Sequence, residues 1–160
     1  MQKFTFFVAF IFSSLCFAQD VKSPEEFLGY TVGTQFSRHA DVVAYFEHVA
    51  QNSDWVTYKE YGRTNERRPL TYAIVTSPQN QANIESIRTD HLKNTGIQEG
   101  TANPDKAIVW LSYNVHGNEA SSTEASMLTL YELITEKKDW LENTVVIIDP
   151  CINPDGRDRY

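Results

Sequence analysis

The chain has 160 residues with 14 basic and 21 acidic side chains, which give a formal net charge of −7. This length suits one domain with a sizeable core. Because nucleic acid phosphates require a basic face and the sequence carries no basic stripe, the composition excludes a nucleic acid partner.

Residues 1–18 have the pattern of a secretory signal peptide. A short basic start ending at Lys3 precedes an almost wholly apolar run over residues 4–12, and small residues lie at positions −3 and −1 of a cut after Ala18. The run is too short to span a membrane, so we expect an exported protein, periplasmic or extracellular, with no membrane span after cleavage. A buried N-terminal helix is the alternative, which the absence of an amphipathic pattern disfavours.

The first half of the mature chain predicts two helices and two strands after an exposed lead-in. Apolar residues at helical spacing predict the first helix, and alternation of apolar and polar residues predicts the strands, which a polar hairpin-like segment over residues 63–68 connects. The expected elements are a lead-in over residues 19–37, a helix over 38–51, strands over 55–61 and 69–76, and a polar helix over 79–93.

The second half predicts a strand, a helix and a strand, which together form a βαβ unit. Residues 107–111 and 145–148 are continuous apolar runs, typical of strands covered on both faces. Residues 119–137 are expected to form the helix, with a buried stripe of Met127, Leu128, Tyr131 and Ile134. The predicted fold class is therefore α/β, with a mixed, largely parallel central sheet and helices on both faces.

The chain ends soon after an Asn-Pro-Asp-Gly turn at residues 153–156, with no closing helix or strand. We therefore expect the fold to be incomplete in this chain, which is interpreted as a fragment. Cys151 is the one cysteine left after signal cleavage, so no internal disulfide is expected, and its place after an apolar run predicts burial.

Candidate metal ligands lie in the loop after the first apolar strand. Sites in parallel α/β sheets collect beyond the carboxyl ends of the strands, and here His116 and Glu119 lie three residues apart, with Gly117 between them. An imidazole nitrogen and a carboxylate oxygen aimed at one point suit zinc. His-x-x-Glu arises by chance in roughly a quarter of such chains. On spacing alone, a helix-dipole role for Glu119 and a hydrogen-bonded loop role for His116 remain equally open.

Other charged residues near these loops are expected to face solvent. Glu124 and Glu132 fall within the following helix, so neither is assigned as a catalytic base. Arg157 and Arg159 follow the Asn-Pro-Asp-Gly turn and are expected to be solvated loop arginines.

Three motifs together resemble the zinc carboxypeptidase family, the M14 peptidases. Gly62 to Leu70 resembles the family's G-x-S/T-x-E-x-R-x-L hairpin, Ser112 to Glu119 its metal-binding loop, and Asp149 to Gly156 its N-P-D-G turn. They occur in the family's order, and the resemblance covers most of residues 38–160. It identifies this segment as the N-terminal part of a catalytic domain.

The resemblance implies that His116 and Glu119 are ligands of Zn²⁺ and that the full-length protein is a metallocarboxypeptidase acting on peptide or protein substrates. A third ligand, a histidine, and a glutamate general base are implied beyond Tyr160, so no catalytic residue is expected in this chain, which alone should be inactive. Many digestive members carry an arginine where this chain has Asn118. Digestive-type specificity is therefore not carried over, and substrate-binding residues stay unassigned.

Two alternatives remain. Zinc amidohydrolases of the succinylglutamate desuccinylase and aspartoacylase type also carry a His-Gly-Asn-Glu loop, although the Gly62 to Leu70 hairpin and the secretion signal disfavour them. A non-catalytic binding module of the same fold is the second alternative, and the sequence beyond Tyr160 distinguishes it. The oligomeric state is left open.

Overall fold

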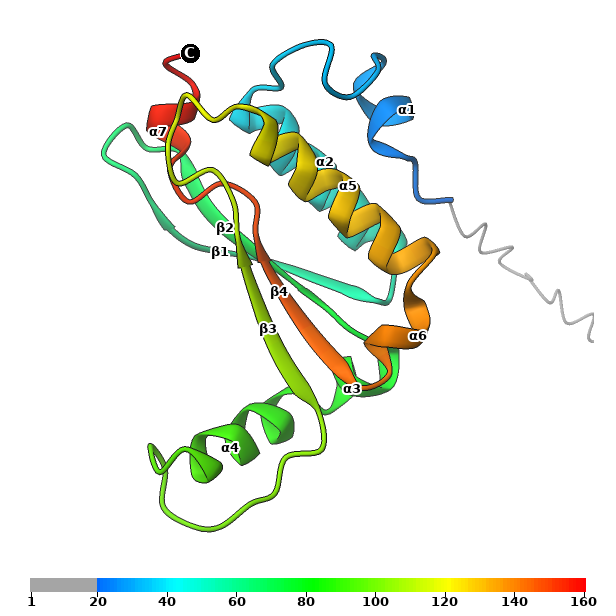
Figure 1. Cartoon of the computed structure of the whole chain (residues 1–160), viewed down its shortest axis with the longest axis vertical. Coiled ribbons are helices and arrows are strands. Elements are labelled where there is room, and N and C mark those ends of the chain that lie inside the picture. The colour runs from blue at the N-terminus through cyan, green and yellow to red at the C-terminus, as the bar shows by residue number, and fades with distance from the viewer. Residues whose placement is uncertain (1–19) are drawn as a thin grey trace, which may run out of the picture.

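The computed structural model describes residues 20–160, so the predicted signal peptide at residues 1–18 lies outside the described residues (Figure 1). In chain order the elements are α1 (Pro24–Leu28), α2 (His39–Asn52), β1 (Val56–Arg63), β2 (Pro69–Val75), α3 (Pro78–Ala82), α4 (Ile84–Asn94), β3 (Ala107–Ser112), α5 (Ser121–Thr135), α6 (Lys138–Leu141), β4 (Thr144–Asp149) and α7 (Pro154–Arg157).

The strands form one mixed sheet in the order β1-β2-β4-β3. The hairpin pair β1–β2 and the pair β2–β4 are antiparallel, whereas β3 and β4 are parallel, with Ser112 opposite Asp149 at their carboxyl ends. The predicted α/β class with a mixed sheet is confirmed. Parallel pairing, however, is limited here to β3 and β4, because the hairpin contributes two antiparallel neighbours to the sheet.

One face of the sheet is covered by α2 and α5, which lie side by side in Figure 1. The core between these layers comes from the apolar positions of both helices and from inward side chains of β2 and β4; its fully buried members include Val42, Phe46, Met127, Leu130, Ala73, Val75 and Ile148. Burial of each large side chain stabilises the fold by roughly 1.5–3 kcal/mol. Leu128, predicted for the buried stripe, is instead 36% exposed, because the buried face of α5 follows the helical spacing Met127, Leu130 and Ile134.

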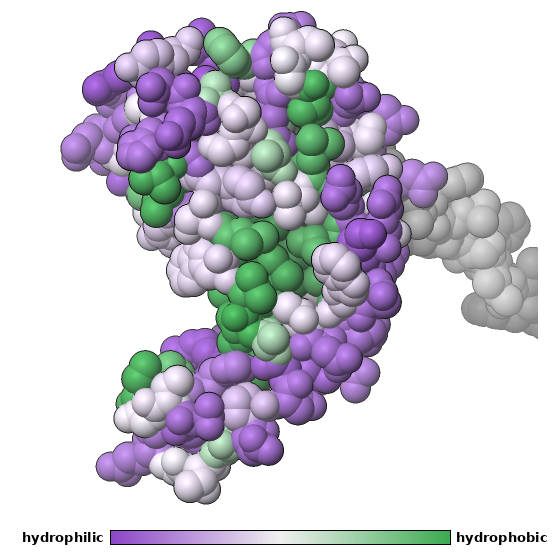
Figure 2. Space-filling model, viewed as in Figure 1, coloured by the Kyte–Doolittle hydropathy of each residue, from purple (hydrophilic) through white to green (hydrophobic). Residues whose placement is uncertain are grey.

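The opposite face of the sheet is largely open. In β3, Ile108 and Trp110 are 38% and 63% exposed, so the prediction that this strand is covered on both faces is wrong within residues 20–160. The physical reason is that a groove, and not a packed helix, lies over Ile108 and Trp110 in the described part of the chain. Helix α4 lies on this side, and an apolar groove of about 520 Å³ runs between its Ile84 and Ile87 and the sheet. Figure 2 shows the apolar surface that lines this hollow.

Two predicted helices have different bounds in the structure. The helix expected over residues 79–93 is divided at Asn83, whose φ of −113° and ψ of 14° are not helical, into α3 and α4. The helix expected from residue 119 begins at Ser121, which leaves Glu119 in the loop before it. None of the helices among the described residues is long and apolar enough to cross a membrane.

The lead-in packs against the domain. A capping box between Ser23 and Glu26 begins α1, and the ring of Phe27 lies edge-on to that of Tyr45 in α2, with 5.3 Å between ring centroids. This segment therefore shares the core of the domain that follows it.

Candidate metal centre

The predicted ligands His116 and Glu119 lie together in the loop between β3 and α5. His116 Nδ1 is 3.1 Å from Glu119 Oε2, and the two side chains are 69% and 62% exposed. The main chain brings the two side chains close together, because the Glu119 N–H donates to the His116 carbonyl at 3.1 Å in a tight turn. Both donor atoms thus converge on one point at an open surface.

This separation fits two ligands of one zinc ion. Zinc binds imidazole nitrogen and carboxylate oxygen at about 2.0–2.2 Å, and tetrahedral geometry then places the two ligand atoms about 3.3–3.6 Å apart. The observed 3.1 Å, the length of a hydrogen bond, is slightly shorter, so a small outward shift of either side chain brings both atoms to ligand separation. The exposure of both side chains leaves room for a further ligand and for a substrate.

Asn114 fixes the shape of the metal loop, which is defined here as residues 114–119. It has a φ of 54°, a left-handed conformation that asparagine tolerates better than most residues. Its buried side-chain amide donates to the carbonyls of His116 at 2.9 Å and Glu119 at 3.2 Å. One side chain therefore holds the main chain at both ligands. The sequence offered no signal for this role.

The loop after β4 lies directly against the metal loop. Asn153 Nδ2 donates to the Val115 carbonyl at 3.0 Å. Gly117 and Gly156 meet so closely that a Cβ atom added to Gly117 would lie 2.1 Å from the Gly156 carbonyl oxygen. Because β3 and β4 are parallel neighbours, the sheet brings these two loops to the same edge, as predicted.

Buried groups at the end of β4 support both loops. Asp149 accepts hydrogen bonds from the Tyr61 hydroxyl at 2.7 Å and the Cys151 N–H at 3.2 Å. Burial raises the pKa of Asp149, and these two hydrogen bonds offset the rise only in part. Cys151 is buried, as predicted, and burial raises the pKa of its thiol to about 12. The neutral thiol lies 3.2 Å from Asn114 Oδ1 and can donate to it.

Glu124 is buried, and the expectation that it faces solvent is wrong. It is 3% exposed. Its carboxylate accepts from the Gly33 N–H at 2.6 Å, and from the N–H and hydroxyl of Ser37 at 3.0 and 2.8 Å. Glu132 is exposed, as expected. Local helical pattern does not reveal the partners of Glu124, because they lie about 90 residues earlier in the chain.

Arg157 is also buried, so its prediction as a solvated arginine is wrong. Its guanidinium donates to the Ser37 carbonyl at 2.5 Å and to Thr123 Oγ1 at 3.3 Å. Arg159 is exposed, as predicted, and pairs with Glu66. Ser37 therefore connects two buried charges, Arg157 and Glu124, through its main chain and hydroxyl.

Replacement of Glu124 by alanine should lower the free energy of unfolding of the full-length protein by about 2–4 kcal/mol. The buried N–H and hydroxyl of Ser37 would lose a charged acceptor, at about 1–3 kcal/mol for each unsatisfied group. Denaturant-induced unfolding measures the loss, and Glu132→Ala on the exposed face of α5 is the control, with an expected change within about 0.5 kcal/mol. Equal losses in the two variants would contradict the role of Glu124.

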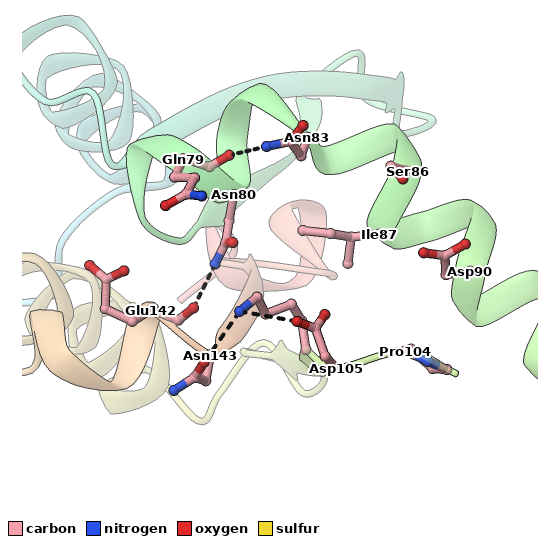
Figure 3. Close-up of a pocket in the computed structure, with 11 residues that line it drawn as sticks. Gln79, Asn80, Asn83, Ser86, Ile87, Asp90, Pro104, Asp105, Glu142 and Asn143 are labelled. Carbon is pink, nitrogen blue, oxygen red and sulfur yellow. Dashed lines mark hydrogen bonds and ion pairs between the residues drawn. The ribbon is translucent and has the colours of Figure 1, made fainter. Parts of the chain in front are cut away.

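A second, polar hollow of about 370 Å³ lies at the opposite end of the sheet (Figure 3). Its residues come from α3, α4 and the segments just before β3 and β4. The Asn80 amide donates to the carbonyls of Leu141 and Glu142 at 3.1 Å, and Lys106 Nζ donates to Asn143 Oδ1 at 3.3 Å. These contacts join the segments that lead into β3 and β4, so Asn80, Lys106 and Asn143 hold the structure together at this hollow.

Within residues 20–160, no group of three or more His, Cys, Asp or Glu side chains is gathered as a complete metal site requires. His116 and Glu119 thus form a pair of donors in the described part of the chain.

Comparisons with known proteins bear on the family and the fold of the chain. A family model described as zinc carboxypeptidase matches residues 42–160. The structure of the carboxypeptidase A from Helicoverpa armigera superimposes with a TM-score of 0.61 at 19% identity, over 85% of this chain and 32% of that chain. Bovine thrombin-activatable fibrinolysis inhibitor, solved in complex with tick carboxypeptidase inhibitor, superimposes with a TM-score of 0.55 at 17% identity, over 78% of this chain and 33% of that one. A comparison with curated proteins finds no match.

Proposed function

Because this chain belongs to the zinc carboxypeptidase family, we propose that the full-length protein is an exported zinc metallocarboxypeptidase that hydrolyses peptide bonds. The chain spans about a third of the length of the Helicoverpa armigera relative. The activity, the peptide substrate and the export are therefore proposed for the whole protein, of which residues 42–160 are one part of the catalytic domain.

One observation carries the proposal: His116 Nδ1 and Glu119 Oε2 lie 3.1 Å apart at the carboxyl end of β3. This is the place where a parallel sheet presents its functional loops, and it is the position of the family's metal-binding motif. The hairpin and the N-P-D-G turn that accompany the motif in sequence also contact one another in space, since Thr64 Oγ1 donates to Asp155 at 2.7 Å. That contact favours a carboxypeptidase over a deacylase, which is expected to lack the hairpin.

The residues of this chain are proposed to bind the metal ion and to orient its ligands. His116 and Glu119 would hold the ion, Asn114 holds the main chain at both ligands, and the exposed side of the loop receives the substrate. When bound, zinc supplies Lewis-acid chemistry for amide hydrolysis. The third ligand and the glutamate that moves the proton are proposed to lie beyond Tyr160.

Removal of the metal tests this function. The full-length protein is expected to lose its peptidase activity on exhaustive chelation and to regain it when one equivalent of zinc is added. A mock-treated sample carried through the same dialysis is the control. Activity that survives chelation would contradict the zinc assignment, and a protein that binds zinc yet cleaves no peptide would identify a binding module of the same fold.

A further inference from the structure

We propose that Asp155 is a positioning residue that couples the hairpin at residues 62–70 to the geometry of the metal loop. The proposal rests on the proposed function, because the geometry it concerns is that of His116 and Glu119. It assigns a role to a residue that touches neither of these ligands.

Asp155 lies under the hairpin and binds it at three points. Its carboxylate accepts from Thr64 Oγ1 at 2.7 Å, from the Glu66 N–H at 3.3 Å and from Arg68 Nη1 at 2.8 Å. The side chain is 18% exposed. Two of these donors are side chains and one is main chain, so the hairpin is held in both position and register.

Arg68 extends the contact along the turn. While one end of its guanidinium binds Asp155, its Nε donates to Asp158 Oδ2 at 2.9 Å. The other oxygen of Asp158 accepts from the His39 N–H at 3.0 Å, at the start of α2. The planar, multiple-donor guanidinium can span two carboxylates in a way that a lysine cannot. The turn at residues 153–158 is therefore fixed against two other elements.

Charge strengthens these contacts. Burial by itself would raise the pKa of Asp155, but the hydrogen bonds from Thr64, Arg68 and the Glu66 main chain outweigh it and lower the pKa. The carboxylate is thus ionised at neutral pH, and hydrogen bonds to an ionised acceptor are about twice as strong as neutral ones.

The turn passes this constraint to the metal loop through the Asn153 side chain and through the close approach of Gly156. Gly156 N–H donates to Asn153 Oδ1 at 3.0 Å, and the amide of the same Asn153 donates to the Val115 carbonyl. Gly156 also lies directly against Gly117, the residue between the two ligands. A turn that moves would therefore change the relative orientation of His116 and Glu119.

The test compares the full-length protein with its Asp155→Ala variant by amide hydrogen exchange in the metal-free state. The Glu119 N–H, which donates to the His116 carbonyl, is the local probe. The Ile148 N–H in β4 reports on the core. We expect exchange of the Glu119 amide to accelerate by about tenfold or more in the variant while exchange at Ile148 stays within about twofold of the wild type.

Zinc affinity provides the second readout. In chelator competition, the dissociation constant for zinc should rise by about 10–100-fold in Asp155→Ala, the effect of losing a group that orients a ligand. Asp155→Asn keeps one acceptor oxygen and should restore part of the affinity. Glu60→Ala, which breaks the exposed Glu60–Arg63 pair on the same hairpin, is the matched control and should leave both readouts unchanged.

Equal acceleration at Glu119 and Ile148 would show that Asp155 only stabilises the fold. No acceleration at either amide would show that Asp155 does not hold the metal loop, and either result would overturn the proposal. If Asp155→Ala does not fold, Arg68→Lys is measured in its place, since lysine keeps the charge but cannot span both carboxylates. A wild-type protein that binds no zinc would refute the proposed function, whereas the exchange experiment would still decide whether Asp155 controls the loop.

Discussion

Replacement of His116 by alanine is expected to abolish stoichiometric zinc binding by the full-length protein while its fold is retained. The loss of a ligand should reduce affinity by more than the about 10–100-fold that follows the loss of a group orienting one. Stability should change by no more than about 0.5 kcal/mol, because the side chain is mostly exposed and contacts Glu119 alone among the ion-pair partners found in the structure. The contacts of the His116 carbonyl with Asn114 and Glu119 do not depend on the imidazole.

Zinc content by elemental analysis and the free energy of unfolding in chelator measure these two effects. His91→Ala is the control, because His91 lies in α4, remote from the metal loop, and binds the Lys106 carbonyl. That variant should keep one zinc per chain. Retention of one zinc per chain in His116→Ala would show that the ion is held by other residues.

Replacement of Gly117 by alanine is expected to weaken zinc binding about as severely as His116→Ala does, although the substitution removes no ligand. The added Cβ atom would lie 2.1 Å from the carbonyl oxygen and 2.2 Å from the carbonyl carbon of Gly156. These neighbours are main-chain atoms, so a side-chain rotation cannot relieve the clash, and the metal loop must move away from the turn. We expect the zinc dissociation constant to rise by at least about 100-fold, by comparison with the effect of losing an orienting group.

Gly62→Ala is the matched control for this variant. A Cβ atom added to Gly62 would meet its nearest neighbour, Leu70 Cδ1, at 3.9 Å, which is ordinary van der Waals contact, and the φ of Gly62 is not positive. Zinc affinity of Gly62→Ala should stay within about twofold of the wild type. Wild-type affinity in Gly117→Ala would contradict the close approach of the two loops, which the structure places at the centre of the site.

The elements that could be predicted from the sequence are those whose pattern is local. Helix α2 follows from apolar spacing, strands β1 and β2 from alternation, and β4 from a continuous apolar run, and each begins and ends within a few residues of its predicted bounds. The burial of β3 could not be predicted in this way. An apolar run indicates that a strand is covered in the complete fold, but its exposure in this chain depends on which neighbours the described residues supply.

The candidate site also combines features that a local sequence pattern predicts with features that depend on tertiary packing. The spacing of His116 and Glu119 left their role open until the two accompanying motifs favoured a metal site, and the structure places their side-chain N and O atoms 3.1 Å apart. The groups that hold the loop lie far away in sequence: Cys151 contacts Asn114 across 37 residues, and Arg68 contacts Asp155 across 87. Such contacts depend on tertiary packing, and no local periodicity records them.

The exposed apolar side chains of β3 affect what can happen to the protein during its synthesis. Ribosomes add about 5–20 residues per second, so in a protein as long as the Helicoverpa armigera relative the remaining two-thirds would take on the order of tens of seconds to emerge. During this interval β3, an edge strand of the described sheet with exposed apolar side chains, would be available to pair with the same strand of another nascent chain. An unpaired apolar edge of this kind favours association of incompletely synthesised chains, so the yield of folded protein should fall as the concentration of such chains rises.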